Sequence, residues 1–397
     1  MPYYRRVGSV PRKRHTVHRV DGGVAVEELM GIDGFSGASA LLYHRHSPSA
    51  IVRIEPVDSV EAEFRENMPL RPYHFRPSEL AATATGGSAS GGSASGDPVL
   101  GRQPLLGNTD VSISWVDAAQ TSQLYRNATG DELIYVQSGS AVLESVFGRL
   151  DVGAGDYVVV PMSTTHRWVI AAGAEMLVIA ARRHISVPSR YTDGAGQFLE
   201  GSPFSERDQR GPDAEPLLVE GAEVPILVRT RTGLSMHIHA THPFDVIGWD
   251  GCLYPWALNI ADFEPIVGRI HQPPPVHQTF AGSGFVVCSF VPRLFDFDPD
   301  AVKVPYHHAN VDTDEVLFYS AGDFMSRAGS GIGAGSISLH PAGFVHGPQP
   351  GSFERSIAVD RTVETAVMLD AFSPLGLTDA ALAISDPAYP WSWARQP

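Results

Sequence analysis

The sequence predicts an all-β fold, and two observations support this class. Short runs rich in β-branched and aromatic residues recur along the chain, among them AVLESVF, DYVVVP, EMLVIAA, GFVVCSFV and SIAV. Turn-forming residues separate these runs, since the 397 residues include 39 glycines and 31 prolines. This alternation of strand-like runs and turns is typical of β-sandwiches and barrels, and few stretches have the apolar spacing of a helix.

Elements other than strands are few along the chain. Residues 82–98, ATATGGSASGGSASGDP, repeat GGSAS and predict a flexible surface loop. Residues 200–216 are polar and rich in turn formers, and we expect them to connect two halves of the chain. Near the C-terminus, TDAALAISDP predicts one short helix.

Composition limits the possible partners and the location. The 29 basic and 44 acidic residues give a formal net charge of −15, which disfavours a surface for nucleic acid. The N-terminal segment is basic but has no apolar signal-peptide region, and no apolar run is long enough to span a membrane. We therefore expect a cytoplasmic protein. Cys252 and Cys288 form no CxxC pair, so we expect core residues rather than a disulfide or a thiolate site.

A histidine-rich motif, HHANVDTDEVLFYSAG, spans residues 307–322. In it, His308, Asn310 and Glu315 are followed by six residues and a glycine. A second motif with the spacing G-x5-P-x-G-x2-H follows and ends at His346. Together they resemble the paired motifs of the cupin superfamily, H-x-H-x(3,4)-E-x6-G and G-x5-P-x-G-x2-H, with Asn310 in place of the second histidine.

The first half repeats this scheme in a weaker form. Asn127 and Glu132 match the first motif, Tyr125 stands where its first histidine is expected, and His166 ends the second motif. The resemblance implies two cupin domains, each a double-sheet jelly-roll barrel. The predicted division is a degenerate N-terminal cupin at 1–232 and a metal-binding catalytic cupin at 233–397.

Strand geometry explains how the second half could hold a metal. His308 and Asn310 are two residues apart and would face the same side of a strand, whereas His307 would face the other side. Glu315 returns on the paired strand and His346 arrives from another hairpin, so three ligands can converge. Two imidazoles and one carboxylate leave open positions on the metal, as in the facial triad of non-heme Fe(II) oxygen chemistry.

Other histidines have less specific interpretations. His166 and Glu132 are expected to satisfy internal hydrogen bonds rather than to hold a metal, since two ligands make a weak site. The stretch MHIHATH contains His237, His239 and His242, which could mimic a metal cluster because alternate residues share a strand face. Their role stays open at this point.

Segments distributed along the chain also resemble the homogentisate 1,2-dioxygenase family in its shorter bacterial form. The resemblance covers roughly residues 1–375, apart from the GGSAS loop. It is carried by LLYHRHSPSAI, DPVLGRQPLLGN, YRNATGDELIYVQSG, THRW, THPFDVIGWDGCLYP, GRIHQPPPVHQTF, PYHHANVDTDEVLFY and GSISLHPAGFVHGPQPG.

The resemblance implies roles for particular residues. The iron ligands of the family fall on His308, Glu315 and His346, the three residues already selected by spacing. A family histidine beside the substrate, an acid–base or hydrogen-bonding group, falls on His271.

Substrate-contacting positions of the family fall on Asn310 and His340. Nine residues after the metal glutamate the familiar enzymes carry a tyrosine that contacts substrate, and here this position is Phe324. Loss of a hydroxyl that pairs with a buried polar group costs about 1–3 kcal/mol. We therefore expect the chemistry to transfer from the family more reliably than the substrate.

The sequence thus predicts an Fe(II)-dependent dioxygenase that uses O₂ to cleave the ring of a small hydroquinone-type substrate. Homogentisate giving maleylacetoacetate is the named reaction. The alternatives are a related dioxygenase acting on another substituted hydroquinone or catechol, or a non-redox metal cupin such as an isomerase or a binding protein. We expect a homo-oligomer without nucleic-acid or membrane partners.

Overall fold

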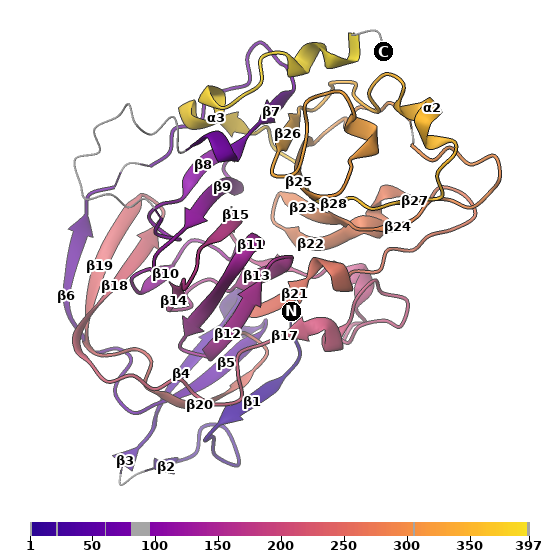
Figure 1. The fold of residues 1–397 in the computed structure, drawn as a ribbon. Helices are drawn as coiled ribbons and strands as arrows, with labels where there is room; N and C mark the ends of the chain where they lie inside the picture. Colours follow the sequence, from indigo (N-terminus) through magenta and orange to yellow (C-terminus); the bar gives the residue numbers. More distant parts are fainter. Residues whose placement is uncertain (1, 21–22, 60, 81–95, 305, 395–397) are drawn as a thin grey trace.

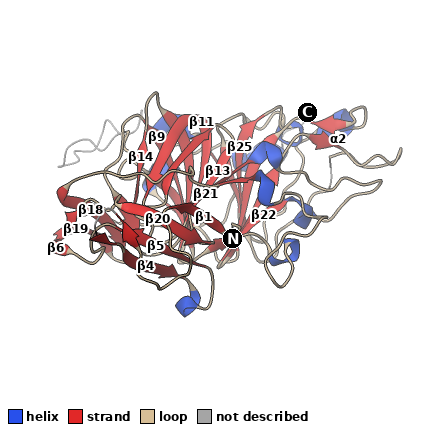
Figure 2. Ribbon diagram, turned by 90° about the horizontal axis from the view of Figure 1, so that it is seen from below, coloured by secondary structure: helices blue, strands red, loops and turns tan. Residues whose placement is uncertain are grey.

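The computed structural model describes residues 2–20, 23–59, 61–80, 96–304 and 306–394 (Figure 1). Of the predicted loop at 82–98, residues 82–95 lie outside the described residues. The described chain is built mainly from strands, and its helices are short (Figure 2). The all-β prediction is therefore confirmed. None of the helices in this part of the chain is long and apolar enough to cross a membrane.

The largest sheet has 14 strands and forms most of the N-terminal barrel. Its strands are β6 (Ile51–Val57), β8 (Gln103–Gly107), β9 (Val111–Ala118), β10 (Tyr125–Asn127), β11 (Glu132–Ser145), β12 (Gly148–Gly153), β13 (Asp156–Val160), β14 (His166–Val169), β15 (Ala174–Ala181), β17 (Gln209–Arg210), β18 (Ala222–Thr230), β19 (Gly233–Thr241), β21 (Trp256–Asn259) and β29 (Gly376–Leu377). The main path runs β29-β8-β9-β15-β11-β14-β10-β18-β19-β6, with β12, β13, β17 and β21 attached to it.

The C-terminal barrel is built on a 7-stranded sheet. Its strands are β7 (Tyr73–Phe75), β16 (Ile185–Ser186), β22 (Gln278–Gly282), β23 (Phe285–Phe290), β25 (Asp314–Ala321), β26 (Ile337–His340) and β28 (Thr365–Ala371). The order is β16-β22-β23-β28-β25-β26-β7, so β25 lies in the middle between β28 and β26. The two barrels match the double-cupin architecture that the motifs predict.

Smaller sheets and short helices complete the fold. A 4-stranded sheet has the order β1-β20-β5-β4, and two further pairs are two-stranded. The strands are β1 (Arg5–Gly8), β4 (Val26–Gly31), β5 (Ser39–His44) and β20 (Val246–Gly251), with β2 (Arg19–Val20) paired to β3 (Gly23–Val24) and β24 (Arg293–Leu294) paired to β27 (Arg361–Thr362). The helices of the described residues are α2 (Ser352–Ser356), α3 (Asp379–Ala383) and 3-10 turns at Asp33–Phe35, Pro77–Glu79, Ser189–Tyr191, Glu206–Asp208, Ile260–Asp262, Pro274–His277, Met325–Arg327 and Tyr389–Ala394.

Two local predictions have opposite outcomes. The predicted C-terminal helix is α3, where the Thr378 side chain accepts a hydrogen bond from the Ala381 N–H and caps the first turn. The strand expected at SIAV is wrong, because Ser356 ends α2 and Ile357 continues in helical backbone geometry. The Ile357 side chain is exposed, so this β-branched residue has no sheet face to bury it.

Strand β11 of the N-terminal barrel alternates between two buried environments. In β11, Leu133 and Tyr135 belong to the core shared by the two halves, whereas Ile134 and Val136 belong to the interior of the N-terminal barrel. This explains why LIYV at 133–136 reads as a continuous apolar run, since both of its faces are buried. The same alternation sends Glu132 into the barrel interior.

The two barrels pack through an aromatic interface. The Trp115 and Phe318 ring centroids are 5.6 Å apart, and those of Tyr157 and Phe280 are 5.1 Å apart. The Tyr135 hydroxyl lies 2.8 Å from the Ser320 Oγ atom, so polar atoms at this interface also find partners.

Short strands also cross between the halves. β7 comes from the first half of the chain but pairs with β26 in the C-terminal sheet, and Figure 1 shows the two side by side. β16 pairs in the same way with β22, whereas β29 from the C-terminal end pairs with β8. The boundary predicted at residue 232 falls between β18 and β19, which pair with each other. The division into 1–232 and 233–397 therefore stays a prediction.

A buried ion network in the 4-stranded sheet gives a prediction for the pH dependence of stability. The His44 Nδ1 atom lies 2.6 Å from Asp245 Oδ1, and its Nε2 atom lies 2.9 Å from Glu28 Oε2. Burial alone would lower the pKa of His44, but these two carboxylates raise the pKa to about 9. Because the folded pKa exceeds the unfolded value, the stabilisation is complete below about pH 6.5. It is lost as pH rises through 9, and its size is about 3 kcal/mol.

The test compares urea unfolding of the native protein and His44→Gln at pH 6.5 and pH 9.5. We expect the variant to be less stable at pH 6.5 and to lose less stability at pH 9.5. His15→Gln, which changes an exposed histidine, serves as the control. If the free energy of unfolding fell equally in the native protein and in His44→Gln between pH 6.5 and pH 9.5, His44 would not be the group responsible.

Candidate metal centre

Glu315 lies on β25 at the centre of the C-terminal sheet. It pairs with His340 of β26 on one side and with Asp370 of β28 on the other. Its neighbour Val316 belongs to the core shared by the two halves, so strand alternation directs Glu315 into the barrel. The carboxylate is buried, with a side-chain exposure of 8%.

The two histidines reach the same place from loops at the ends of strands. His346 follows β26 after a turn in which Gly343 has a φ of 76°, a conformation that favours glycine. The His308 N–H donates to the His346 carbonyl and the His346 N–H donates to the His308 carbonyl, both at 2.8 Å. This reciprocal pair is an isolated bridge, so the predicted strand through His308 and Asn310 is wrong. The chain turns away at once, and Val311 is 88% exposed.

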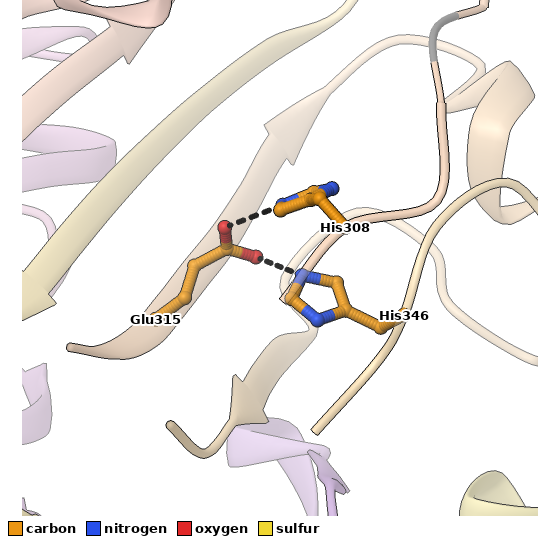
Figure 3. Close-up of side chains that lie close together, drawn as sticks. All are labelled: His308, Glu315 and His346. Atoms are coloured by element: carbon orange, nitrogen blue, oxygen red, sulfur yellow. Dashed lines mark ion pairs between the residues drawn. The ribbon is translucent and has the colours of Figure 1, made fainter. Parts of the chain in front are cut away.

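The structure brings the three predicted ligands together (Figure 3). One ligand atom from each of His308, Glu315 and His346 lies within 4.8 Å of the others. The Glu315 Oε1 atom is 3.2 Å from His346 Nε2, and Oε2 is 3.7 Å from His308 Nε2. Among the described residues, no other group of three or more His, Cys, Asp or Glu side chains converges in this way.

The hydrogen bonds around His346 indicate that a cation fits this group. The Nδ1 atom lies 3.0 Å from the Phe344 carbonyl oxygen, which can only accept, so Nδ1 carries the proton. In the form of the ring that binds a metal, Nε2 carries a lone pair, and this atom is buried without a hydrogen-bond partner among the described residues. It faces the Glu315 Oε1 atom, and a carboxylate oxygen can only accept a hydrogen bond. A metal ion between these atoms would satisfy both.

His340 lies behind Glu315 and holds the carboxylate in place. Its Nδ1 atom is 2.8 Å from Glu315 Oε1, and its Nε2 atom is 2.8 Å from the Tyr389 hydroxyl. Burial lowers the pKa of His340 to about 3, so the ring is neutral and can donate to Glu315 while accepting from Tyr389. His340 is fully buried and both of its ring nitrogens have protein partners, and its predicted contact with substrate stays a prediction.

The electrostatics of Glu315 favour the ionised form. Burial alone would raise its pKa, but interactions with His308, His340 and His346 hold the pKa well below its usual range. A carboxylate that stays ionised is the form that binds a metal.

Asp370 is a second carboxyl group beside the triad, and its residue is half-buried. Burial and the charge of Glu315 raise the pKa of Asp370 to about 7. The Asn310 Nδ2 atom donates to Asp370 Oδ1 at 3.3 Å, which is the polar contact found for this predicted substrate-binding residue. Its role toward a substrate stays a prediction. Asp370 carries no motif signal, and only the strand pairing reveals its position.

A cavity of about 740 Å³ adjoins the segments that carry the histidine ligands. His271, the predicted acid–base residue, lines this cavity together with Tyr306 and His307. The His271 Nε2 atom is 3.1 Å from the Tyr306 hydroxyl, and the Tyr306 ring stands edge-on to His308 at 6.0 Å between centroids. His307 faces the cavity rather than the triad, as expected for a residue that is not a ligand.

Phe324 does not line this cavity among the described residues. It is buried, and its ring packs edge-on against Tyr319 with centroids 5.0 Å apart. Tyr319 in turn lies 3.1 Å from Ser338 Oγ and accepts a hydrogen bond from Arg327. Phe324 therefore has no side chain in the wall of this cavity, and its predicted contact with substrate stays a prediction.

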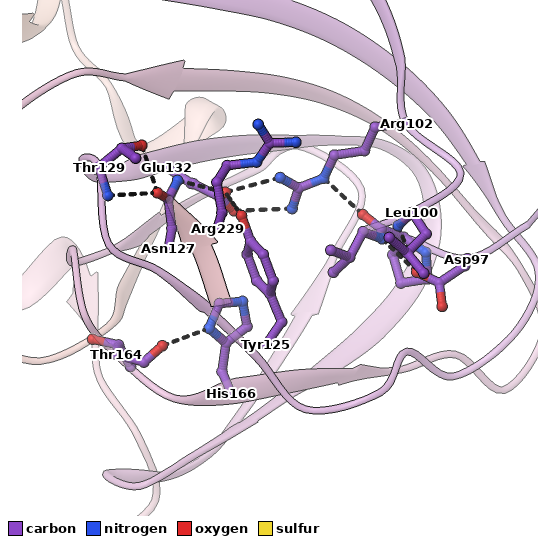
Figure 4. A network of polar contacts seen from close by, with 12 residues as sticks. Asp97, Leu100, Arg102, Tyr125, Asn127, Thr129, Glu132, Thr164, His166 and Arg229 are labelled. Carbon is purple, nitrogen blue, oxygen red and sulfur yellow. Dashed lines mark hydrogen bonds and ion pairs between the residues drawn. The ribbon is translucent and has the colours of Figure 1, made fainter. Parts of the chain in front are cut away.

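The corresponding site in the N-terminal barrel holds an arginine (Figure 4). Arg102 donates two hydrogen bonds of 2.9 Å to the two oxygens of Glu132. The Tyr125 hydroxyl and the Asn127 amide each donate to Glu132 Oε1 at 3.0 Å. Burial alone would raise the pKa of Glu132, but Arg102 lowers it to about 2. Glu132 therefore satisfies internal hydrogen bonds, as predicted, and a guanidinium group supplies the positive charge.

The open question about MHIHATH is resolved in part. His239 and His242 line a small polar pocket of about 60 Å³ with His44, Glu28 and Asp245. Within the described chain these side chains do not form a group that could hold a metal ion.

The fold and the site together define a two-barrel cupin whose second barrel gathers two imidazoles and one carboxylate. The chain is 40% identical over 397 residues to a protein of Saccharolobus solfataricus named "putative dioxygenase", and the match covers 99% of both chains. The chain belongs to the same family as this protein.

More distant relatives match part of the chain. Homogentisate 1,2-dioxygenase of Emericella nidulans is 23% identical over 252 residues, which is 60% of this chain and 54% of that protein. The enzyme of the same name from Bradyrhizobium diazoefficiens is 24% identical and also matches over 54% of its length. The chain thus spans about half the length of these relatives.

Solved structures resemble the chain only loosely. Protein Ylba from E. coli matches 79% of this chain and 94% of its own, with 11% identity and a TM-score of 0.34. A cupin 2 conserved barrel domain protein from Leptotrichia buccalis matches 82% and 99%, with 9% identity and a TM-score of 0.30. No protein-family model matches the chain.

Proposed function

We propose that the protein is an Fe(II)-dependent dioxygenase that cleaves the aromatic ring of a hydroquinone-type substrate. The observation that carries the proposal is the convergence of His308, Glu315 and His346, with the lone pair of a buried imidazole facing a carboxylate. Two histidines and one carboxylate are the donor set of non-heme Fe(II) oxygenases. The names of the full-length relative and of the partial relatives support a dioxygenase.

We assign roles to the three ligands, and to the residues that hydrogen-bond to them, from their contacts. Fe(II) bound by these ligands would supply open coordination positions for a phenolic oxygen and for O₂. His340 orients Glu315 through the 2.8 Å hydrogen bond, and Tyr389 orients His340 in turn. Such outer contacts fix ligand geometry and typically change metal affinity or activity 10- to 100-fold when removed.

In this proposal, His271 and Tyr306 accept a phenolic proton at the cavity wall. The His271 Nδ1 atom faces Asp296 Oδ2 at 3.6 Å, and its Nε2 atom faces the Tyr306 hydroxyl at 3.1 Å. A proton on Nδ1, oriented toward Asp296, leaves Nε2 as an acceptor. The imidazole can then take a proton directly from a bound phenol or through the Tyr306 hydroxyl.

The proposed function is tested by oxygen consumption. The Fe(II)-loaded protein is mixed with a panel of hydroquinones and catechols, and O₂ uptake is followed together with loss of the aromatic absorbance. The conversion of homogentisate to maleylacetoacetate is the reference reaction for this panel. Stoichiometric O₂ uptake with ring opening supports the proposal, and an iron-loaded protein that is inert toward every compound contradicts it. The cytoplasmic location and the homo-oligomer stay predictions.

Replacing His271 separates its role from that of the ligands. We expect His271→Ala to lower kcat by about 10²- to 10⁴-fold, the usual contribution of a general acid–base group. The iron content should stay close to that of the native protein, because His271 makes no contact with the triad. Gln272→Ala, next to it in the same segment, is the matched control. Parallel loss of iron and activity in His271→Ala would mean that the residue is structural.

A further inference from the structure

The cavity lined by residues that flank the two histidine ligands in sequence has a lining that would select among substrates. Tyr306 and His307, which precede His308, line one part of it, and Pro348 and Gln349, which follow His346, line another. Its volume of about 740 Å³ lies in the range of roughly 300–1,000 Å³ that is typical of sites for drug-sized ligands. A single small ring would therefore leave much of this space unfilled.

The uncharged part of the lining is largely apolar. Val302, Phe353 and Trp393 contribute side chains to the cavity. Trp393 is fixed in place because its Nε1 atom donates to the Gly347 carbonyl at 2.9 Å. The Trp393 ring also stands 6.1 Å from the His340 ring, so the apolar wall reaches the region behind Glu315.

The charged part of the lining is acidic. Asp296, Asp298, Asp300 and Glu354 line the cavity, and no lysine or arginine does so among the described residues. Asp298 has a cationic partner, Arg269, at 2.7 Å. Asp300 and Glu354 have no ion pair within the part of the chain that the structure describes. A carboxylate on a substrate would meet Asp300 and Glu354 here, whereas the cations beside the lining, Arg269 and Lys303, are already engaged with Asp298 and with the Asp296 carbonyl oxygen.

We propose, on the basis of the proposed function, that the substrate is an uncharged hydroquinone or catechol with a bulky apolar ring substituent. Like charges brought together without compensation weaken binding strongly, and an acidic entrance also repels an approaching anion. Homogentisate carries a carboxylate and is therefore the wrong type of ligand for this cavity. The apolar wall formed by Phe353 and Trp393 instead gains contact area from an apolar substituent.

The first experiment compares homogentisate with its methyl ester, which keeps the hydroquinone ring and removes the charge. Binding to the Fe(II)-loaded protein is measured by anaerobic calorimetry, and kcat/KM is measured by O₂ uptake. We expect the ester to bind at least about tenfold more tightly. The kcat/KM values should follow the same order, and tert-butylhydroquinone should also be preferred to homogentisate.

The second experiment changes the charge of the cavity. Asp300→Asn/Glu354→Gln should lower the preference for the ester about 3- to 10-fold at low ionic strength, because nearby charges are weakly screened there. Glu63→Gln/Glu66→Gln removes two exposed carboxylates that do not line the cavity and should leave the preference unchanged.

The outcomes distinguish this inference from the proposed function. Tighter binding of homogentisate than of the ester, or equal effects of the two double variants, would overturn the inference while O₂ uptake still supported the dioxygenase. Preferential binding of the ester without O₂ uptake from any compound would support the uncharged specificity of the cavity and overturn the proposed function. Failure of all three compounds to bind would overturn the inference.

Discussion

Glu315→Ala is expected to lose most of the iron that the native protein binds, with a fall in metal affinity of at least about 100-fold. The carboxylate is one of three ligands, and removal even of outer contacts typically costs 10- to 100-fold. Two histidines would remain, and His340 would lose its acceptor. The measurement is metal analysis after anaerobic loading with one equivalent of Fe(II) per chain, followed by desalting.

The matched control for this prediction is Asp370→Asn. Asp370 lies opposite Glu315 on the neighbouring strand and is half-buried, but it is not part of the triad. We expect this variant to keep its iron. Circular dichroism of both variants checks that the barrel is folded. Full iron occupancy in folded Glu315→Ala would exclude Glu315 as a ligand.

Arg102→Met is expected to destabilise the protein by about 3–5 kcal/mol, because it leaves a buried carboxylate without its cation. Glu132 is buried, with a side-chain exposure of 1%, and the side chain of Arg102 is 12% exposed. The remaining donors, Tyr125 and Asn127, are neutral and cannot compensate the charge. The free energy of unfolding in urea gives the measurement.

A double variant shows whether the unpaired charge is the cause. Arg102→Met/Glu132→Gln removes the cation and the anion together and keeps an oxygen that can accept from Tyr125, so it should be more stable than Arg102→Met alone. Arg149→Met, which breaks the exposed pair with Asp151, should change stability little. A loss for Arg102→Met no larger than for Arg149→Met would contradict the prediction.

Sequence patterns could predict the triad because sheet geometry converts spacing into position. Glu315 faces the barrel interior through strand alternation, and His346 follows a hairpin whose Gly343 adopts the required positive φ. The same patterns could not reveal Arg102, which is 30 residues from Glu132 and lies outside both cupin motifs. In the N-terminal barrel the Arg102 guanidinium supplies the positive charge beside Glu132, whereas in the C-terminal barrel we propose that a metal ion supplies it.

The sequence also could not predict which way certain side chains point or how deeply they are buried. The resemblance places His340 near the site, but only the pairing with Glu315 and Tyr389 shows that it lies behind the ligands. SIAV has strand propensity, yet no neighbouring strand is available to bury it. The cavity charge depends on Asp300 and Glu354, which are far apart in sequence and carry no signal for proximity.

The exchange of short strands between the barrels has a consequence for how the protein is made. During synthesis β7 emerges early, but its partner β26 emerges only after most of the chain, and β8 waits even longer for β29. These long-range pairings give the fold a high contact order, which slows folding and leaves strand edges open in the meantime. Neither barrel is a portable unit that could be shuffled between genes, because each would leave behind strands that complete the other.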